Sequence, residues 1–377
     1  MQAIAADRVF DGDSFHDRAA VLLDQGRILG LVAQADLPPD VPVTRVAGLL
    51  APGFVDAQVN GGGGVLLNDA PTPDAMQTIA AAHRPYGTTA LLPTLITDTP
   101  QAVTAAIAAC TAASGAVAGL HLEGPHLAPA RKGTHLASLM RPMSAADLDE
   151  LCAAARMLPA LLLTVAAEQV TPAQVRALVA AGATVSLGHT DCTADQAAAL
   201  FAAGASGVTH LFNAMSGLGH RAPGLVGAAL EAPGVWAGII ADGCHVDPAA
   251  LRIALRAKRV PGRLFLVTDA MSLVGSDGDS LMLNGRTIRR HATPGTVSRL
   301  TLADGTLAGS DLDMATAVRF AVEHLDLELA EVLRMASLYP ATFLRLPGRG
   351  RLAPGYRADM VALGDELRVT GVWVGGA

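Results

Sequence analysis

The feature of this 377-residue sequence that most constrains its fold is a regular alternation of short apolar runs with Ala-rich helical patterns. The runs have β-type composition, and helical patterns fill most of the gaps between them, for example at 73–87, 171–183 and 247–259. The eight runs are 53–60, 88–94, 116–124, 161–168, 183–190, 207–214, 236–243 and 263–270. Eight repeats of strand and helix favour an α/β fold, a (β/α)8 barrel of the TIM type.

The two ends of the chain have a different sequence pattern from its middle. Residues 1–48 and 350–377 read as short strands separated by turns. Because chain termini often lie close together, we expect a small β-sandwich domain built from both termini. The predicted division is 1–49 and 348–377 for this small domain and 50–347 for the barrel. A β-rich excursion at 276–310 is expected to form a long loop over the barrel mouth.

Composition narrows the class of protein. Hydrophobic residues make up 51% and charged residues 16%, so the chain can bury a large core and is not globally disordered. The net charge is −7 and there is no basic run, so nucleic acid and anionic membranes are poor partners. Mean hydropathy is +0.38, yet no uninterrupted apolar stretch is long enough for a transmembrane helix.

The expected location is the cytoplasm. The first residues carry two early acids and lack the basic and apolar regions of a signal peptide. Cys110, Cys152, Cys192 and Cys244 lie far apart without CxxC pairing, as in reduced thiols of a cytoplasmic enzyme. The simplest interpretation of each cysteine is a small buried hydrophobic residue.

Residues capable of chemistry stand at the ends of the predicted barrel strands. The carboxyl ends of barrel strands converge on one mouth, where active sites of this fold are found. A single histidine after a strand is usually structural, but two histidines with a glutamate and an aspartate on four strands indicate a site. The residues at these ends are Gln58, Asn60, Glu123, Glu168, His189, His210, Asn213, Asp242, His245 and Asp269.

Glu123, His189 and His210 have the composition of a catalytic Zn²⁺ site with one coordination position open for water. A metal in such a site lowers the pKa of its water towards about 7. Asp269 is then the free carboxylate that can take the proton of the water and pass it to a leaving group. Considered alone, Asp269 is equally well interpreted as a helix N-cap or a loop carboxylate.

Six ordered segments carry a resemblance to a known family. They are PGFVDAQVNG, HLEGPHLAPARKGTH, SLGHT, THLFNAM, IIADGCHVD and LVTDAM, and the match continues from about residue 50 to GTLAGS at 305–310. The chain resembles N-acetylglucosamine-6-phosphate deacetylases of the amidohydrolase superfamily. The resemblance implies metal-dependent hydrolysis of the acetamide of N-acetyl-D-glucosamine 6-phosphate, in amino-sugar catabolism and cell-wall sugar recycling. It also implies a homodimer and a phosphorylated amino sugar as the small-molecule partner.

The resemblance also assigns roles to residues of this chain. Metal ligands fall on Glu123, His189 and His210, and the proton-shuttling aspartate falls on Asp269. His135 would hydrogen-bond the acetyl carbonyl oxygen and stabilise the oxyanion. Arg221 and His245 would hold the 6-phosphate, with donation of one of them by a partner subunit left open. The full set of implied substrate contacts is Thr134, His135, Asn213, Ala214, Arg221, Asp242, Gly243, Cys244, His245, Leu307, Ala308 and Gly309.

The sequence departs from many amidohydrolases in two places. Gln58 and Asn60 stand where a His-x-His pair binds a more buried metal, and an amide is a poor transition-metal ligand. Some members of the deacetylase family share this Gln-x-Asn, and resemblance to them implies one metal per subunit, Zn²⁺ first and Fe²⁺ or another divalent ion as alternatives. Lys132 and Lys258 are the only lysines and neither ends a barrel strand, so no bridging carbamylated lysine is available. Both absences argue against hydantoinase-like and dihydroorotase-like enzymes, the nearest alternative.

Several interpretations stay open. His121 faces the same way as Glu123 and is either a partner of the metal ligands or an alternative ligand. His126 is a loop histidine near the entrance or a substrate contact, and Glu168 is expected to have a solvent-linked or hydrogen-bonding role. The preference between the glucosamine and galactosamine epimers is undecided. A barrel without catalytic activity, serving as an assembly protein, is disfavoured because the three ligands and Asp269 are all present.

Overall fold

The computed structural model describes residues 1–292 and 297–377, and it contains the predicted barrel. Its strands are β5 (Phe54–Val59), β8 (Thr88–Ile96), β9 (Leu120–Glu123), β10 (Leu161–Val165), β11 (Thr184–Leu187), β12 (Gly207–Val208), β13 (Trp236–Ile239) and β14 (Leu264–Leu266). They form one parallel sheet in the order β14-β13-β12-β11-β10-β9-β8-β5. A parallel bridge between Val59 and Ala270 brings the two edges together and nearly closes the sheet into a barrel.

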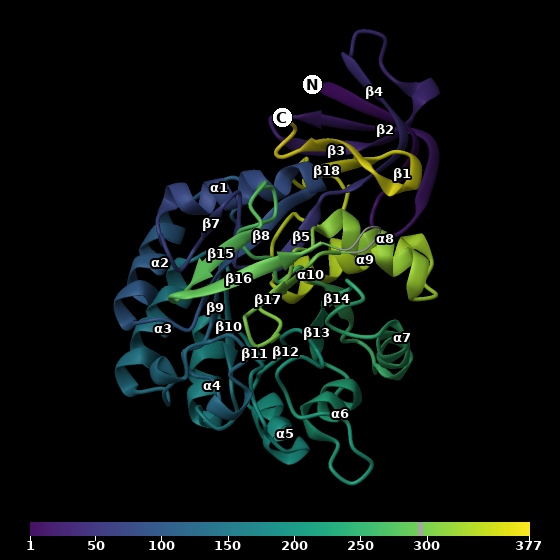
Figure 1. The fold of residues 1–377 in the computed structure, drawn as a ribbon. Coiled ribbons are helices and arrows are strands. Elements are labelled where there is room, and N and C mark those ends of the chain that lie inside the picture. Colours follow the sequence, from purple (N-terminus) through teal and green to yellow (C-terminus); the bar gives the residue numbers. More distant parts are fainter. Residues whose placement is uncertain (293–296) are drawn as a thin grey trace.

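Helices surround this barrel (Figure 1). They are α1 (Pro73–His83), α2 (Pro100–Ala112), α3 (Ala145–Met157), α4 (Pro172–Ala181), α5 (Ala194–Ala202), α6 (Gly224–Glu231), α7 (Pro248–Ala257), α8 (Met314–His324), α9 (Leu329–Ala336) and α10 (Leu338–Phe343). Short 3-10 helices lie at Gln34–Asp36, Arg84–Tyr86, Pro129–Arg131, Ala137–Leu139 and Asp365–Leu367. Helices α9 and α10 pack on β14 and β5, so they cover the seam where the barrel closes.

The helices begin where the sequence places capping residues. Thr72, Thr99 and Thr171 each accept a hydrogen bond from a backbone N–H in the first turn, and a proline occupies the first helical position after each of them. A threonine cap satisfies an otherwise unpaired amide, and proline loses nothing at a position whose N–H has no helical partner. The predicted helices at 73–87, 171–183 and 247–259 correspond to α1, α4 and α7.

The two termini form the predicted small β domain, seen beside the barrel in Figure 1. Its strands are β1 (Gln2–Phe10), β2 (Phe15–Asp24), β3 (Arg27–Ala33), β4 (Val43–Pro52), β18 (Met360–Leu363) and β19 (Val369–Trp373). They belong to a single sheet in the order β19-β18-β4-β1-β2-β3, whereas a sandwich was expected. The boundaries at 49 and 348 stay a prediction.

Alternation along two strands joins this sheet to the barrel. Leu50 and Met360 point into the small domain's own core, whereas the adjacent Leu49 and Val361 pack against the barrel core. Because successive side chains of a strand point to opposite faces, one sheet serves both cores.

The predicted excursion at 276–310 is a three-stranded antiparallel sheet of β15 (Ser280–Leu283), β16 (Arg286–His291) and β17 (Arg299–Thr301), with 293–296 outside the described residues. A hairpin of β6 (Gly61–Gly62) and β7 (Val65–Leu66) lies beside it. Leu281 and Ile288 of the excursion pack against Ile96 and Met271, which are at or just beyond the carboxyl ends of β8 and β14. The excursion therefore covers part of the barrel mouth.

Some barrel strands are shorter than expected. The run 207–214 is extended only at Gly207–Val208, and the run 161–168 ends as a strand at Val165. His210, Phe212 and Ala214 have positive φ values, which an extended strand does not allow. The polar residues of these runs therefore lie on the loops after the strands.

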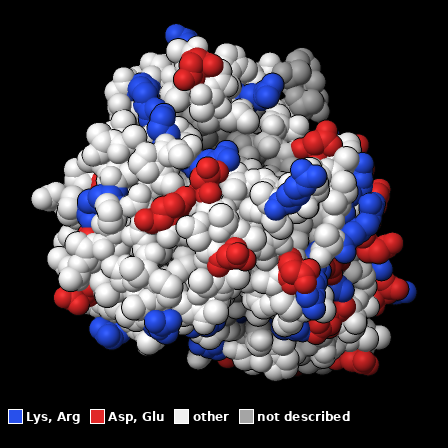
Figure 2. Space-filling model, turned by 90° about the horizontal axis from the view of Figure 1, so that it is seen from below, with Lys and Arg blue, Asp and Glu red and all other residues white. Residues whose placement is uncertain are grey.

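No helix in the described part of the chain is both long and apolar enough to cross a membrane. Figure 2 shows one face of the molecule, on which Lys and Arg side chains are intermingled with Asp and Glu among many uncharged residues.

Candidate active site

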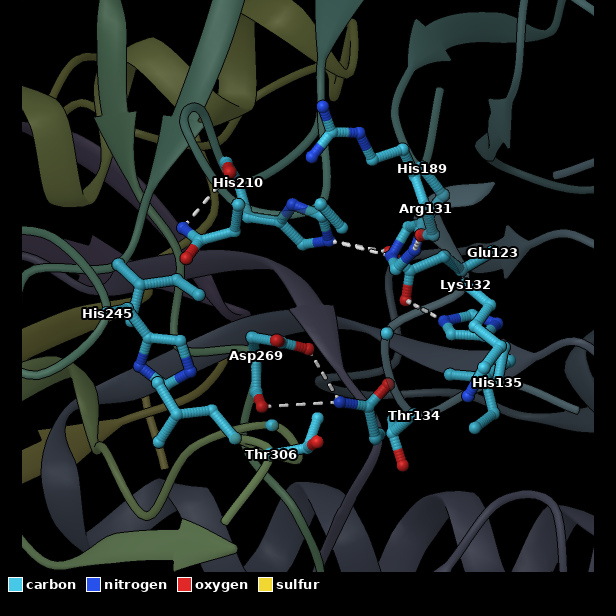
Figure 3. A pocket seen from close by; sticks show the side chains of 18 of the residues that line it. Glu123, Arg131, Lys132, Thr134, His135, His189, His210, His245, Asp269 and Thr306 are labelled. Carbon is cyan, nitrogen blue, oxygen red and sulfur yellow. Dashed lines mark hydrogen bonds and ion pairs between the residues drawn. The ribbon is translucent and has the colours of Figure 1, made fainter. Parts of the chain in front are cut away.

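A cavity of about 530 Å³ opens at the mouth of the barrel. This volume lies within the range of roughly 300–1,000 Å³ found for small-molecule sites. Its wall is built from loops that follow the barrel strands and from the end of the excursion (Figure 3). The predicted site residues that line it are Asn60, Glu123, Thr134, His135, His189, His210, Asn213, Ala214, His245, Asp269, Leu307 and Gly309.

Glu123, His189 and His210 converge in this cavity, as Figure 3 shows. Glu123 Oε1 lies 3.2 Å from Nε2 of His189 and 2.9 Å from Nε2 of His210, and the two nitrogens are 3.1 Å apart. Ligands placed 2.0–2.1 Å from a tetrahedral metal are about 3.3 Å from one another. The three atoms are therefore spaced closely enough to bind a single ion.

The hydrogen bonds around these residues favour the protonation states that metal binding requires. His189 Nδ1 lies 2.8 Å from the carbonyl oxygen of Arg131, so Nδ1 donates its proton there and Nε2 keeps a lone pair. Burial opposes ionisation of Glu123, but the neighbouring His189 and His210 rings hold its pKa well below the usual value. One anionic carboxylate and two imidazoles are the donor set of a transition-metal site, so these residues fit a divalent metal.

Backbone strain is concentrated at the same strand ends. His189, His210 and Asp269 have φ values of +46°, +30° and +53°. Left-handed backbone at residues other than glycine is unfavourable and is typical of functional sites. Gly188 makes the turn at His189 feasible, because a Cβ there would lie 2.8 Å from the side chain of Thr164.

Asp269 is held by two side-chain amides. Its Oδ1 accepts hydrogen bonds from Gln58 Nε2 at 3.1 Å and from Asn60 Nδ2 at 2.7 Å. Gln58 Nε2 also lies 3.2 Å from Glu123 Oε1, so this amide separates the two carboxylates. Burial, followed by the charge of Glu123, raises the pKa of Asp269, and a cation bound at the glutamate would oppose that shift.

His135 lies beside the same cluster. Its ring contacts that of His189 in a tilted arrangement with centroids 4.4 Å apart, and its Nε2 is 3.7 Å from Glu123 Oε2. Nδ1 lies 2.8 Å from the hydroxyl of Thr97 and faces the Thr97 backbone N–H at 3.4 Å, which can only donate. Nδ1 is therefore an acceptor, and the ring proton is on Nε2. Burial, with the charge of His189, lowers the pKa of His135 to about 3, so its ring is a neutral donor.

His245 lines the cavity on another wall, and Asp242 holds it there. Asp242 accepts a hydrogen bond from His245 Nδ1 at 2.6 Å and two more from the backbone N–H groups of Cys244 and His245. The structure thus gives Asp242 a positioning role, and Asp242, Gly243, Cys244 and Ala308 do not line the cavity.

Arg221, a predicted phosphate contact, does not lie where the prediction places it. It is exposed in the loop between β12 and α6 and does not line the cavity of its own chain.

The open assignments for the other polar residues have structural outcomes. His121 is buried between Thr94 and Thr164, with its two nitrogens 3.1 and 2.8 Å from their hydroxyls, so both ring nitrogens are occupied. His126 lies outside the cavity lining, with Nδ1 3.1 Å from the Arg141 carbonyl. Glu168 accepts hydrogen bonds from the Thr190 hydroxyl and the Asp191 backbone N–H, as expected.

Sequence reasoning missed three parts of the site. Arg131 and Lys132 line the cavity, and Thr97 holds His135. The position of Arg131 and Lys132 inside HLEGPHLAPARKGTH, directly before Thr134 and His135, was a signal that could have found them. Thr97 had no such signal, since no polar site residue was expected at the end of the predicted strand 88–94.

Comparison with known proteins identifies the family of this chain and several relatives. Residues 49–377 match the amidohydrolase family. The chain is 41% identical to an N-acetylgalactosamine-6-phosphate deacetylase of Shewanella sp. (strain ANA-3), over 98% of this chain and 93% of that protein. It is 32% identical to the N-acetylglucosamine-6-phosphate deacetylase of Haemophilus influenzae, over 95% of this chain and 93% of that protein.

Solved structures agree with these relatives. The chain is similar to the N-acetylglucosamine-6-phosphate deacetylase of Pasteurella multocida, with a TM-score of 0.93 and 31% identity over 100% of this chain and 98% of that one. It is also similar to a mutant of the Mycobacterium smegmatis deacetylase in complex with N-acetyl-D-glucosamine-6-phosphate, with a TM-score of 0.90 and 34% identity over 100% and 98% of the two chains.

Proposed function

Because this chain belongs to the amidohydrolase family, we propose that it hydrolyses the acetamide of N-acetyl-D-glucosamine 6-phosphate to D-glucosamine 6-phosphate and acetate. The observation that carries the proposal is that Glu123, His189 and His210 converge in one cavity that also contains Asp269 and His135. The relatives named as deacetylases of this substrate support its identity. The reaction belongs to amino-sugar catabolism and cell-wall sugar recycling.

We propose one divalent metal per subunit, held by Glu123, His189 and His210, with Zn²⁺ the first candidate and Fe²⁺ or another divalent ion as alternatives. The donor set of one carboxylate and two imidazoles supports this proposal. A metal bound there supplies an activated water and polarises the acetyl carbonyl. Gln58 supports a single ion, because its amide occupies the space between Glu123 and Asp269.

Asp269 and His135 then have complementary roles. Asp269 accepts a proton from the attacking water on Oδ2, since Oδ1 already accepts from Gln58 and Asn60. The same carboxyl later gives that proton to the nitrogen of the sugar as the C–N bond breaks, so acetate and the amine leave. His135 donates a hydrogen bond from Nε2 to the acetyl oxygen, where negative charge develops during attack.

Cavity-lining residues are proposed to hold the sugar. The Thr134 hydroxyl is buried and has no hydrogen-bond partner within the described residues, so it is free to bind a sugar oxygen. Asn213, Ala214, Leu307 and Gly309 form further parts of the wall. His245, oriented by Asp242, is proposed to contact the phosphate.

We propose that the enzyme is a homodimer in which Arg221 of one subunit serves the cavity of the other. The exposure of Arg221 outside its own cavity supports this arrangement. Light scattering gives the mass in solution. Mixing the Arg221→Ala variant with the Asp269→Asn variant tests whether Arg221 of one subunit and Asp269 of the other form one working site. Recovery of activity on mixing supports shared sites, and no recovery contradicts them.

N-acetyl-D-galactosamine 6-phosphate is the second candidate substrate. The observation that favours it is that two relatives named as deacetylases of this epimer are 41% and 38% identical to the chain. The two sugars differ in the orientation of one hydroxyl, which a few loop contacts can read.

One experiment tests the function and the epimer together. Turnover is measured with both N-acetylhexosamine 6-phosphates and with both unphosphorylated sugars, and metal content is measured on the same sample. Release of acetate from a phosphorylated sugar by metal-loaded protein supports the proposal, and absence of turnover on all four overturns it.

We also propose a cytoplasmic location. Its support is that Cys110, Cys152, Cys192 and Cys244 are all free thiols, which suits a reducing compartment.

A further inference from the structure

The cavity poses an electrostatic problem for an anionic substrate. The chain carries a net charge of −7, and Glu123 and Asp269 both line the cavity. Arg221, the guanidinium expected at the phosphate, lies outside it. Among the described residues that line the cavity, Arg131 and Lys132 are the ones with a side chain that is always cationic near neutral pH.

The Arg131 guanidinium already forms an ion pair with Asp191. Its Nε and Nη2 donate to Asp191 Oδ1 at 2.9 and 2.7 Å. The carboxylate of Asp191 offsets the positive charge of this guanidinium, and the pair anchors the loop to the start of the segment before α5. Arg131 therefore supports the wall, and its Nε and Nη2 are already occupied by Asp191.

Lys132 has a fixed backbone and a free side chain. The Lys132 carbonyl accepts the His135 N–H at 3.0 Å, and the neighbouring carbonyls of Arg131 and Thr134 accept from His189 Nδ1 and from the Arg286 guanidinium. The Lys132 side chain is exposed, and none of the ion pairs formed within residues 1–292 and 297–377 includes it. Figure 3 shows Lys132 on the same wall of the cavity as Thr134 and His135.

The charge of Lys132 is also felt by one exposed carboxylate, Asp304. Asp304 precedes Thr306 and Leu307, which form part of the cavity wall. The pKa of Asp304 is lowered, chiefly by its hydrogen bonds with Thr306 and in a smaller part by the charge of Lys132. Asp304 is fully exposed, so water screens this attraction and leaves Lys132 available to a stronger anion.

We propose that Lys132 is the cation with which the chain's own cavity selects substrates that carry a phosphate ester. This inference rests on the proposed deacetylation and deepens it by naming a specificity residue. A phosphate carries more negative charge than a carboxylate and offers several acceptor oxygens, so it displaces the weak attraction to Asp304. The fixed backbone means that only the lysine side chain has to be ordered when the substrate binds.

The first test compares kcat/KM for N-acetylglucosamine 6-phosphate with kcat/KM for N-acetylglucosamine. We expect Lys132→Gln to lower the ratio of the two values roughly 5- to 30-fold, the effect of losing a partly screened charged hydrogen bond. Lys132→Arg should restore most of the ratio. Lys258→Gln is the matched control, since Lys258 Nζ binds the carbonyls of Ala232 and Arg259 away from the cavity.

A second test does not depend on turnover. The chain has only two lysines, so limited acetylation by an N-hydroxysuccinimide ester followed by mass spectrometry reports on each separately. We expect glucosamine 6-phosphate, but not glucosamine, to protect Lys132, while Lys258 is acetylated equally with both.

These outcomes separate the inference from the function on which it rests. If the wild type deacetylates the phosphorylated sugar but Lys132→Gln keeps its ratio within about twofold, the inference is wrong and the function stands. Equal acetylation of Lys132 with both sugars also overturns it. If the wild type hydrolyses none of the sugars, the proposed function fails. The acetylation test then decides whether Lys132 binds phosphate, because it compares protection by glucosamine 6-phosphate with protection by glucosamine.

Discussion

Replacement of Asp269 by Asn is the sharpest test of the proposed chemistry, because the structure predicts that it removes proton transfer and little else. Oδ1 accepts from Gln58 at 3.1 Å and from Asn60 at 2.7 Å. The asparagine carbonyl can accept both of these hydrogen bonds, which places the new NH2 group at the position of Oδ2. An amide there has the same size as the carboxylate but cannot take a proton from water.

The expected loss follows from the role of the residue. Proton transfer by a positioned side chain contributes about 10²- to 10⁴-fold, which corresponds to about 2.7–5.4 kcal/mol of transition-state stabilisation. Because the hydrogen bonds of Oδ1 are kept, we expect the loss in kcat with little change in KM. Metal content and the free energy of unfolding should stay near those of the wild type.

The assay is steady-state release of acetate, with metal content measured on the same preparation. Asp277→Asn is the matched control, since it makes the same chemical change at an exposed carboxylate outside the cavity. A loss of less than about tenfold in Asp269→Asn would refute the reasoning, because another group would then have to accept the proton. Loss of metal in the variant would mean that Asp269 acts on the metal site instead.

Three further predictions concern the metal, a buried acid and the phosphate. We expect about one divalent metal per chain and loss of both metal and activity in His189→Ala, measured by elemental analysis; a reproducible count of two would contradict the single-metal site. Burial raises the pKa of Asp56 to about 7, so its contribution to stability is fully present below its unfolded pKa of about 3.9 and is lost as the pH rises towards 7. Relative to the wild type, Asp56→Asn should therefore be more stable at pH 8 than at pH 4 by a few kcal/mol, measured by urea unfolding. An equal difference at both pH values would show that the pKa of Asp56 is not raised in the folded protein. Arg221→Ala should lower kcat/KM roughly 10- to 150-fold for the phosphorylated sugar only, whereas an equal loss on the unphosphorylated sugar would assign Arg221 a structural role.

The barrel and the small domain could be predicted from the sequence because both depend on local patterns. Apolar runs and helical patterns repeat at strand and helix lengths, and threonine or aspartate followed by proline marks where helices begin. The positions of Glu123, His189, His210 and Asp269 at strand ends followed from the same reasoning, since a parallel barrel directs those ends to one mouth.

Other features depend on contacts between segments far apart in the chain. Gln58 separates Glu123 from Asp269 across 65 and 211 positions of sequence, and no local pattern indicates that its amide reaches both. The tautomer of His135 depends on Thr97, and the position of Arg221 depends on the course of an exposed loop. A family resemblance assigns a role to a residue, but it does not give the direction of the side chain.

The sequence by itself therefore determined the strand order, the mouth at which the site is built and the residue types that meet there. Only the tertiary structure decided which groups hold one another and which cations face the cavity. The physical reason is that strand and helix patterns arise from backbone geometry and local burial, whereas hydrogen-bond partners and charge pairs are chosen by loops whose paths depend on packing against the rest of the molecule.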